Sequence, residues 1–511
     1  MRTDRIVTAI SLCVLSLVMA APAAAQLEWP NAPLPVPKEL QKYFEQVKKA
    51  DGIADDEARC KAYPDLPGND WRPGAAQGRC SLLRKPAWSL DEIDSVLSKK
   101  NGADELGRRF AKLHKAHFED QSQREQIFRA FTAFDSSERA GKVAQRWLEL
   151  APDSAYAHAA VAEHYLQVGS EARGINAVSQ TPEDRLETMR AMYLKAMPLY
   201  EAALKLDPKL SVACSQLAVI GRHLSEELRK QATAQCLEVD PDSYYVVYGR
   251  IMSAQPNWGG SMDQMREAVA YAAARTERNP ILGAVIAEDA GYPLYPQNGS
   301  NPGRTEELAK VVRMAPSGTL MNYLGAAYAD GGDSWHAFVY HSQATRFWPH
   351  RGGFRAERGW ALMRVGQYEW ASRDLAEALR ESPDELGYLL SMADSVRRSK
   401  GLVAARPYLL RLSKLSQMRP FAMAFYCDSF MQPKAFDPQA LACTDEYVRE
   451  FAHFNPALGL RAKALYLAKD PRAAEAIERF LAEPRMDNGG EWAGLAKEAE
   501  GWKAALEKAR R

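Results

Sequence analysis

Histidine pairs are the first residues in this sequence whose type and spacing could support chemistry. His114 and His117 lie three residues apart and precede Glu119 and Asp120, so one helix face could present two zinc ligands. Two ligands make a poor zinc site, and we interpret this segment as a solvated helix face. None of the nine histidines falls in the H-E-x-x-H spacing. We therefore predict neither a metal site nor a cofactor.

Two glycine-rich segments have some features of catalytic loops but lack others. Residues 102–108 have the glycine spacing of a phosphate loop, without its lysine and hydroxyl residue and without a preceding strand. Ser261 follows Gly259 and Gly260, as a nucleophile could. It also stands directly before a predicted helix, where serine is a preferred N-cap. We interpret Ser261 as a cap and predict no catalytic residue.

The N-terminus has the layout of a secretory signal over residues 1–25. Two arginines precede an apolar run at residues 6–20, and three alanines at 23–25 supply the small residues that a signal peptidase needs. The run is about 15 residues, shorter than the ~20 that span a bilayer, with an N-terminal anchor as the alternative. Cleavage would make Gln26 the first mature residue, and we predict a periplasmic or secreted protein.

Charge is balanced in this chain, which has 66 basic and 65 acidic residues. The charges are mixed along the sequence, with no long block of one sign. A balanced chain has no general electrostatic attraction to nucleic acid or to an anionic membrane. We therefore predict no nucleic-acid partner, and no membrane span in the mature chain.

Six of the seven cysteines remain after removal of the signal, and they fall into three close pairs. The pairs are Cys60 with Cys80, Cys214 with Cys236, and Cys427 with Cys443. A helical array brings only nearby residues together, so we favour sequential disulfides, with buried thiols as the alternative. Each bond would stabilise the fold by roughly 3 kcal/mol in the chain-entropy model.

Prolines and small residues recur with a period of 34 in the C-terminal half. The residues in step are Pro349 with Pro383, Gly325 with Gly359, Ala337 with Ala371, and Ala344 with Ala378. Small residues allow two antiparallel helices to approach closely, and proline ends the second helix because it lacks an amide hydrogen. One such hairpin cannot bury its apolar face, whereas stacked hairpins can.

This pattern resembles the tetratricopeptide repeat family. The matching residues are Leu324, Gly325, Tyr328, Ala337, Ala344 and Pro349, followed by Gly359, Leu362, Ala371, Leu375, Ala378 and Pro383. A third unit keeps Ala393, Ala405 and Leu412 but has Gln417 in place of the proline. The resemblance implies an all-α fold, an α-solenoid of tetratricopeptide-like helical hairpins with a loop-rich, disulfide-stapled N-terminal cap.

The N-terminal half carries weaker copies of the second-helix pattern. They are Ala140, Ala144, Trp147 and Pro152, then Ala196, Tyr200, Ala203 and Pro208. In this register Cys214 and Cys236 face each other across one hairpin, which requires a Cα separation below about 7 Å. The boxes R-C-x-A-Y-P-D-L-P-G around Cys60 and P-x-W-G-G-S around Trp258 resemble an uncharacterised exported bacterial family, which implies no chemistry.

These features predict six segments along the chain. They are a signal peptide at 1–25, a loop-rich cap at 26–100, an irregular repeat-like helical region at 101–290, a turn-rich linker at 291–310, a regular repeat array at 311–485 and a C-terminal capping helix at 486–511. The linker, G-Y-P-L-Y-P-Q-N-G-S-N-P-G and its flanks, is rich in turn-forming residues.

The family resemblance also indicates a binding surface. Fixed positions of the first helices line the concave face in this family, and here they correspond to Asn322, Trp360, Arg364, Asp394, Arg397 and Arg398. A tryptophan beside three arginines suits a protein or peptide partner with an acidic side chain or a carboxylate end. The alternative is an ordinary charged helix surface.

The sequence as a whole favours a non-catalytic periplasmic scaffold that binds a protein or peptide in a concave groove. Two alternatives stay open. One is an exported cell-wall or peptidase-type enzyme with its site near Trp258, and the other is a purely structural subunit of an envelope assembly. A closed cleft with convergent polar residues would favour the enzyme, and a long open groove would favour the scaffold.

Overall fold

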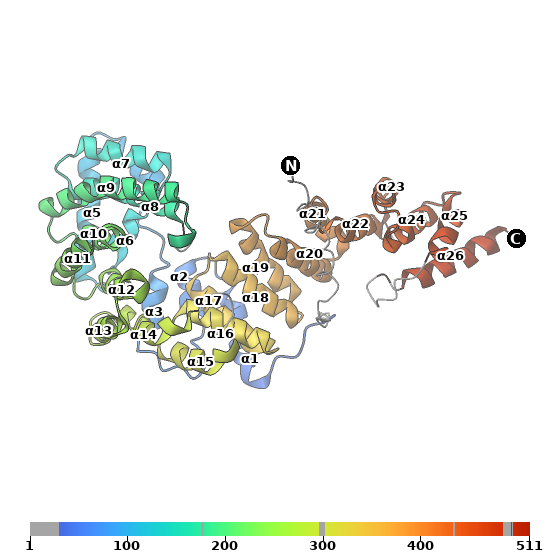
Figure 1. Cartoon of the computed structure of the whole chain (residues 1–511), viewed down its shortest axis with the longest axis horizontal. Helices are drawn as coiled ribbons and strands as arrows, with labels where there is room; N and C mark the ends of the chain where they lie inside the picture. Colours follow the sequence, from blue (N-terminus) through green and yellow to red (C-terminus); the bar gives the residue numbers. More distant parts are fainter. Residues whose placement is uncertain are drawn as a thin grey trace, which may run out of the picture. The chain divides into compact units, whose positions relative to one another are not determined.

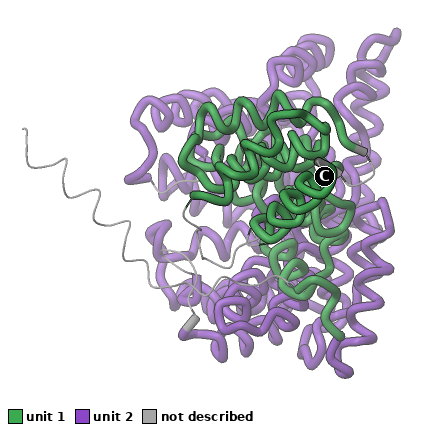
Figure 2. Tube along the Cα trace, turned by 90° about the vertical axis from the view of Figure 1, so that its right-hand side faces the viewer, with its two compact units in different colours: residues 1–35, 355–511 green, residues 36–354 purple. Residues whose placement is uncertain are grey.

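The computed structural model describes residues 30–174, 178–295, 302–432, 435–483, 492 and 494–510. They form two compact units (Figure 2), a larger one of residues 36–354 and a smaller one that combines residues 1–35 with 355–511. The expected signal peptide lies outside the described residues. Within the described ranges, no helix is both long and apolar enough to cross a membrane.

The larger unit consists of helices that pack mainly against their neighbours along the chain (Figure 1), such as α8 on α9, α10 on α11 and α16 on α17. Their bounds are α1 Gln41–Ala50, α2 Asp56–Ala62, α3 Ala75–Ser81, α4 Leu90–Leu97, α5 Gly102–Glu119, α6 Gln126–Phe131, α7 Glu138–Leu150, α8 Ala155–Arg173, α9 Glu183–Leu206, α10 Ser211–Leu224, α11 Glu226–Val239, α12 Tyr244–Ser253, α13 Met262–Ala273, α14 Glu288–Gly291, α15 Thr305–Met314, α16 Gly318–Asp330 and α17 Ser334–Phe347. Short 3₁₀ turns connect several of them, including η3 Pro256–Trp258.

The smaller unit continues the same arrangement from α18, whose first turn still belongs to the larger unit. Its elements are α18 Gly352–Arg364, α19 Tyr368–Glu381, α20 Leu386–Lys400, α21 Leu402–Leu412, α22 Arg419–Asp428, β1 Met431–Gln432, β2 Ala435–Phe436, α23 Gln439–Glu450, α24 Asn455–Leu467, α25 Ala473–Ala482 and α26 Leu495–Arg510. The two strands are two residues each and pair antiparallel between α22 and α23. The described chain is therefore all-α apart from this short two-stranded sheet.

The small residues of the repeat lie where the sequence pattern places them, between paired helices. A Cβ on Gly325 of α16 would lie 2.8 Å from the ring of His341 on α17. A Cβ on Gly359 of α18 would lie 3.1 Å from Leu375 on α19. Ala337, Ala371 and Ala378 are fully buried. The prediction of a tetratricopeptide-like solenoid is confirmed, because the recurring small residues make close helix–helix contact.

The three sequential cysteine pairs are within disulfide distance in the structure. The Cα separations are 5.4 Å for Cys60–Cys80, 5.6 Å for Cys214–Cys236 and 5.5 Å for Cys427–Cys443. Cys214 lies on α10 and Cys236 on α11, and these helices pack on each other. The register that pairs these two cysteines across one hairpin is confirmed. The other two bonds join α2 to α3 and α22 to α23.

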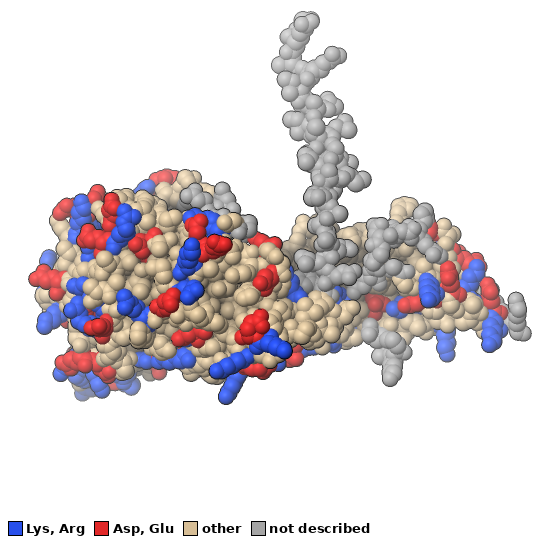
Figure 3. All heavy atoms as spheres, turned by 90° about the horizontal axis from the view of Figure 1, so that it is seen from below, with Lys and Arg blue, Asp and Glu red and all other residues tan. Residues whose placement is uncertain are grey.

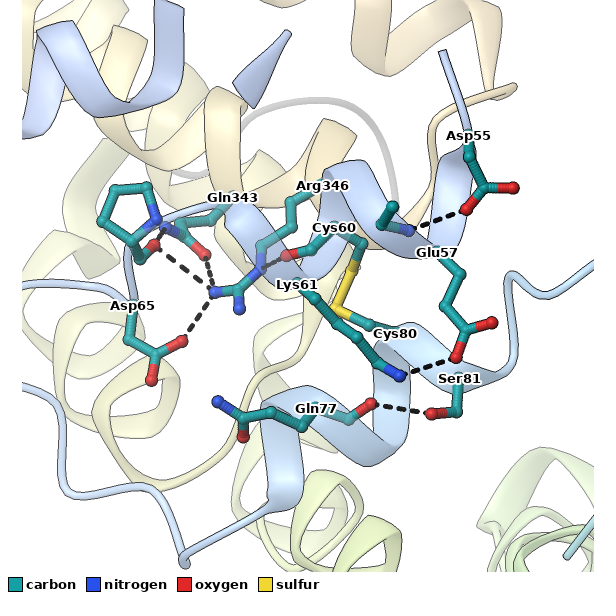
Figure 4. The surroundings of a disulfide bond; sticks show 12 residues. Asp55, Glu57, Cys60, Lys61, Asp65, Gln77, Cys80, Ser81, Gln343 and Arg346 are labelled. Atoms are coloured by element: carbon teal, nitrogen blue, oxygen red, sulfur yellow. Dashed lines mark hydrogen bonds and ion pairs between the residues drawn. A yellow bond between two sulfur atoms is a disulfide. The ribbon is translucent and has the colours of Figure 1, made fainter. Parts of the chain in front are cut away.

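The segment around Cys60 packs on a repeat helix rather than only on itself (Figure 4). The buried guanidinium of Arg346 on α17 donates to the Cys60 carbonyl oxygen at 2.8 Å and to the Asp65 carboxylate at 2.8 Å. Gln343 of α17 donates to the Pro64 carbonyl oxygen at 2.7 Å. The Y-P-D-L-P box and the neighbouring Cys60 carbonyl therefore supply hydrogen-bond acceptors for side chains of α17. A non-helical segment suits this role, because its carbonyl groups are not used within a helix.

The turn-rich segment at 291–310 lies within the larger unit and does not separate the two units. Its described part contains η5 Tyr292–Leu294, η6 Pro302–Arg304 and the start of α15. The division between compact units falls instead at residues 354 and 355, inside the stretch that the sequence treats as one regular array. A local loss of helical pattern therefore marks an irregular connection here, because neighbouring helices still pack around it.

Candidate functional site

The predicted binding residues divide between the two units, and one of them lies in the interior. Asn322 on α16 is only 8% exposed, and its side-chain oxygen lies 3.0 Å from Nδ1 of His341, which is fully buried. The prediction that Asn322 lines an open groove is therefore wrong. A buried polar side chain needs a hydrogen-bond partner, and the facing histidine provides one within the hairpin.

Trp360 and Arg364 lie one helical turn apart on α18, so they share one face of the helix. The indole Nε1 of Trp360 donates to Ser391 Oγ of α20 at 2.8 Å. Both side chains are half-buried. Arg364 forms no ion pair with an acidic residue of the described chain, and its Nε is a buried donor without a partner there. This face therefore has unused hydrogen-bonding capacity.

Asp394, Arg397 and Arg398 form one ion-pair cluster on α20. Asp394 Oδ1 lies 2.6 Å from Arg397 Nη2, and Asp394 Oδ2 lies 2.9 Å from Arg398 Nε. Their side chains are between 21% and 23% exposed. Asp394 therefore pairs with two guanidinium groups at once, and Arg364 on α18 adds a third guanidinium. We call these five residues of α18 and α20 the arginine face.

A segment of the chain itself lies against the edge of the arginine face. The backbone amide of Leu34 donates to the Val365 carbonyl oxygen at 3.0 Å, and the Tyr368 hydroxyl donates to the Pro30 carbonyl oxygen. Arg398 Nη1 is 3.4 Å from the side-chain oxygen of Asn31. This contact could not be predicted from the sequence. Prolines at 30, 33, 35 and 37 indicated a non-helical segment, but nothing local could indicate where it lies.

Gly366 permits this contact, and Gly332 is its matched control one repeat earlier. Both glycines have positive φ, 75° and 84°, so alanine strains the turn at either position. A Cβ on Gly366 would also lie 2.6 Å from the Ala32 carbonyl oxygen, whereas a Cβ on Gly332 meets nothing within 4 Å. We expect Gly366→Ala, and not Gly332→Ala, to increase hydrogen exchange of the Leu34 amide. Equal exchange in the two variants would contradict the docked position of the segment.

The glycines and serine of the P-x-W-G-G-S box have structural roles. Gly259 has a φ of 81°, a conformation that side chains rarely adopt. A Cβ on Gly260 would lie 2.1 Å from the Ala254 carbonyl oxygen. Ser261 Oγ accepts a hydrogen bond from the Gln264 amide, which confirms it as the N-cap of α13. The box therefore forms a tight turn into a helix that its serine caps.

His114 and His117 are buried, so the interpretation as a solvated helix face is wrong. His117 is fully buried, and its Nε2 lies 2.7 Å from Asp240 while its Nδ1 accepts from the Glu125 amide at 2.9 Å. His114 is 6% exposed and contacts Tyr156 and the Lys209 carbonyl. No group of three potential metal ligands occurs in the described ranges. These histidines connect α5 to later helices.

Glu125 is a buried carboxylate that could suggest acid catalysis, but its hydrogen bonds explain it structurally. Burial raises its pKa. The carboxylate accepts from the Ser243 hydroxyl at 2.9 Å, from the Tyr244 amide at 2.6 Å and from Asn279 at 3.2 Å. The Tyr244 amide belongs to the first turn of α12, where a negative group is favourable. Glu125 therefore caps a helix from a distance in sequence.

Another buried carboxylate, Glu288 of α14, lies among tyrosines. Burial raises its pKa to about 7, and Arg79 opposes this shift. Its Oε2 is 3.5 Å from the Tyr295 hydroxyl. Burial also raises the pKa of Tyr295 and of Tyr248. Several groups with shifted pKa values in one cluster are typical of functional sites, but they also occur in structural interiors. The described residues of this cluster include no nucleophile paired with a base.

Comparisons with known proteins give no family assignment. No family model and no curated protein matches the sequence. Solved structures that resemble it include the tetratricopeptide domain of P58(IPK), with 12% identity, 78% of this chain and 99% of that chain covered, and a TM-score of 0.21. A second is a tetratricopeptide repeat protein from Parabacteroides merdae, with 12% identity and a TM-score of 0.24. The match covers 63% of this chain and 95% of that chain. A third is the type IV pilus biogenesis factor PilW, with 18% identity and a TM-score of 0.22. The match covers 50% of this chain and 93% of that chain. The fold assignment rests on the paired helices themselves.

Proposed function

We propose that this chain is an exported, non-catalytic scaffold that binds a short peptide of a protein partner on the arginine face. The observation that supports this most is the docking of residues 30–34 beside it. That segment pairs through a backbone hydrogen bond from Leu34 to Val365 and through Tyr368 and Arg398. A surface that holds one non-helical peptide has the geometry to hold another in its place.

The chemistry of the arginine face favours a partner with a carboxylate. Arg364 has no acidic partner in the described chain, and its Nε is a buried donor without an acceptor there. Guanidinium groups bind carboxylates through paired N–H donors. Trp360 adds an aromatic surface next to them. A peptide with a free C-terminus or an acidic side chain would supply a negatively charged acceptor for Arg364.

Export is part of the same proposal. Three cysteine pairs at bonding distance are favoured by an oxidising compartment. Basic and acidic side chains are interspersed over the face that Figure 3 shows, so a general attraction to polyanions has no support there. We place the protein in the periplasm or outside the cell.

The alternative of an enzyme near Trp258 has less support than binding. His223, beside Trp258, has a pKa lowered to about 4 by burial and by Arg173 and Arg222. A histidine with this pKa is mostly neutral near pH 7 and is a weak base there. Ser261 is occupied as a helix cap. A purely structural role in an envelope assembly is the third reading, and it predicts no peptide affinity.

Binding of a labelled peptide to the full-length protein tests the proposal. The probe is the sequence of residues 30–34 carrying a dye, made once with a free carboxylate at Leu34 and once as the amide. We expect the carboxylate form to bind at least tenfold more tightly, because a hydrogen bond to a charged group contributes about 1.5–3 kcal/mol. Fluorescence anisotropy gives both dissociation constants.

Two variants make this test specific. Arg364→Gln combined with Arg397→Gln should remove the preference for the carboxylate. Arg373→Gln on α19 is the matched control, because this arginine is 69% exposed and pairs with Glu369. It should leave both affinities unchanged. If neither peptide binds saturably, or if the double variant keeps the full preference, the proposal is wrong.

A further inference from the structure

Two arginines of the larger unit lie beside the tryptophan of the P-x-W-G-G-S box. Arg173 is the last residue of α8, and Arg222 lies in the last turn of α10. Their guanidinium carbons are 5.9 Å and 5.5 Å from the centre of the Trp258 ring. His223 also packs on this ring, with the ring centres 4.9 Å apart. Two helices and a turn thus bring two arginines and a histidine to one indole.

These arginines have few partners of their own. In the described part of the chain, Arg222 forms no hydrogen bond and no ion pair, and its Nε is a buried atom without a partner. Arg173 donates to the Gly174 carbonyl oxygen at 2.9 Å, while its Nε is buried and unpartnered as well. Besides burial, Arg229 lowers the pKa of Arg222, and Arg173 and Arg222 lower the pKa of His223. No carboxylate is among these neighbours.

Some other arginines that stack on rings in this protein also pair with a carboxylate. Arg250 lies 4.8 Å from the Tyr271 ring centre and 2.5 Å from Glu267. Arg358 lies 5.7 Å from the Trp370 ring centre and 2.6 Å from Asp374. A buried guanidinium without an acid is costly, because its hydration is lost and nothing replaces it. Arg173 and Arg222 differ from Arg250 and Arg358, because neither forms an ion pair with a carboxylate in the described ranges.

The ends of α8 and α10 account for only part of this arrangement. The C-terminus of a helix carries about half a negative charge and attracts cations. Two full positive charges therefore exceed what two helix ends supply. The helix carbonyls also leave the Nε donors of both arginines unpartnered. A buried donor without an acceptor needs an explanation, and a bound anion would complete its hydrogen bonds.

We propose that Arg173, Arg222 and Trp258 form a binding site for an oxyanion, a carboxylate or phosphate group carried by a ligand. The guanidinium groups supply charge-assisted N–H donors, and the indole supplies an apolar surface for the part of the ligand next to the anion. Neutral His223 adds a ring nitrogen without a further charge. This site lies in the larger unit and does not depend on the arginine face.

Calorimetry of the full-length protein tests the site with sodium acetate and sodium phosphate as separate probes, against sodium chloride at matched ionic strength. We expect saturable heat with at least one oxyanion, and Arg222→Gln should weaken that binding at least tenfold. Preference for phosphate would identify a phosphorylated ligand, and preference for acetate a carboxylic acid. Heat that does not exceed the chloride reference for either probe would overturn the proposal.

The titration of His223 gives a second readout that a purely structural role would not change. Arg173 and Arg222 help to lower its pKa to about 4, so a bound oxyanion should raise the pKa in an NMR titration of the histidine ring. The matched control is Arg250→Gln, which removes a ring-stacked arginine that already has Glu267; this variant should bind like the parent. Should Arg222→Gln fail to fold, Arg173→Gln at the end of α8 takes its place. An unchanged pKa at saturating oxyanion would contradict the assignment.

Discussion

Asp374→Asn should lower the free energy of unfolding by about 3–5 kcal/mol, the largest loss that we expect from a single substitution. Asp374 of α19 is 1% exposed and accepts from Arg358 of α18 at 2.6 Å through both carboxylate oxygens. Arg355 donates to the same carboxylate at 2.8 Å. Asparagine keeps the shape but removes the charge, so the fully buried Arg358 loses its ion pair with Asp374. Urea unfolding followed by circular dichroism measures the change.

Two comparisons separate the buried charge from other effects. Asp384→Asn removes a carboxylate that is 97% exposed, so its cost should stay below about 1 kcal/mol. The double replacement Arg358→Met with Asp374→Leu should cost much less than Asp374→Asn, because a buried ion pair exchanged for apolar side chains is often neutral. A loss from Asp374→Asn no larger than that from Asp384→Asn would show that the pair does not hold α18 on α19.

Glu288→Gln should stabilise the protein by about 3 kcal/mol at pH 8 and change it little at pH 4. The pKa of Glu288 is about 7 in the folded protein, against 4.5 for an ordinary glutamate. Between these values the unfolded carboxyl is ionised while the folded one keeps its proton. Unfolding therefore releases a proton, and the contribution of Glu288 to stability falls as the pH rises through this window. Above pH 7 the buried carboxylate imposes its full penalty.

The pH profile of the variant relative to the parent tests this. The difference in unfolding free energy should grow from pH 4.5 to pH 7 and then level off. Glu277→Gln is the control, because Glu277 lies on the exposed surface of the same unit and its profile should follow the parent. A difference that does not depend on pH would mean that Glu288 is ionised in the folded protein throughout this range.

The sequence was sufficient for the fold because the repeat signal is local and recurs. Gly325 and Gly359 stand in step because each must admit a facing helix, and the structure shows those contacts. Cys214 and Cys236 could be paired by the same register. The division into compact units could not be predicted, because it depends on the number of contacts across residue 354 rather than on local composition.

The candidate sites were harder to predict because their partners are distant in the sequence. His117 looked solvated, but Asp240 lies 123 positions away and buries it. The repeat register placed Asn322 in the groove, yet its side chain is buried and lies within hydrogen-bond distance of His341 on the facing helix. The docking of residues 30–34 depends on Val365 and Tyr368, more than 300 positions later. The local sequence pattern contains no information about contacts between residues so far apart in the chain.

Hydrogen exchange at the Leu34 amide tests the central claim most directly. This amide donates to the Val365 carbonyl beside the arginine face, so it should exchange slowly in the full-length protein. Addition of the carboxylate peptide should speed its exchange as the segment is displaced, and should slow exchange in α20 where the peptide binds. Peptide binding that leaves both the Leu34 amide and α20 unchanged would contradict a peptide site on this face.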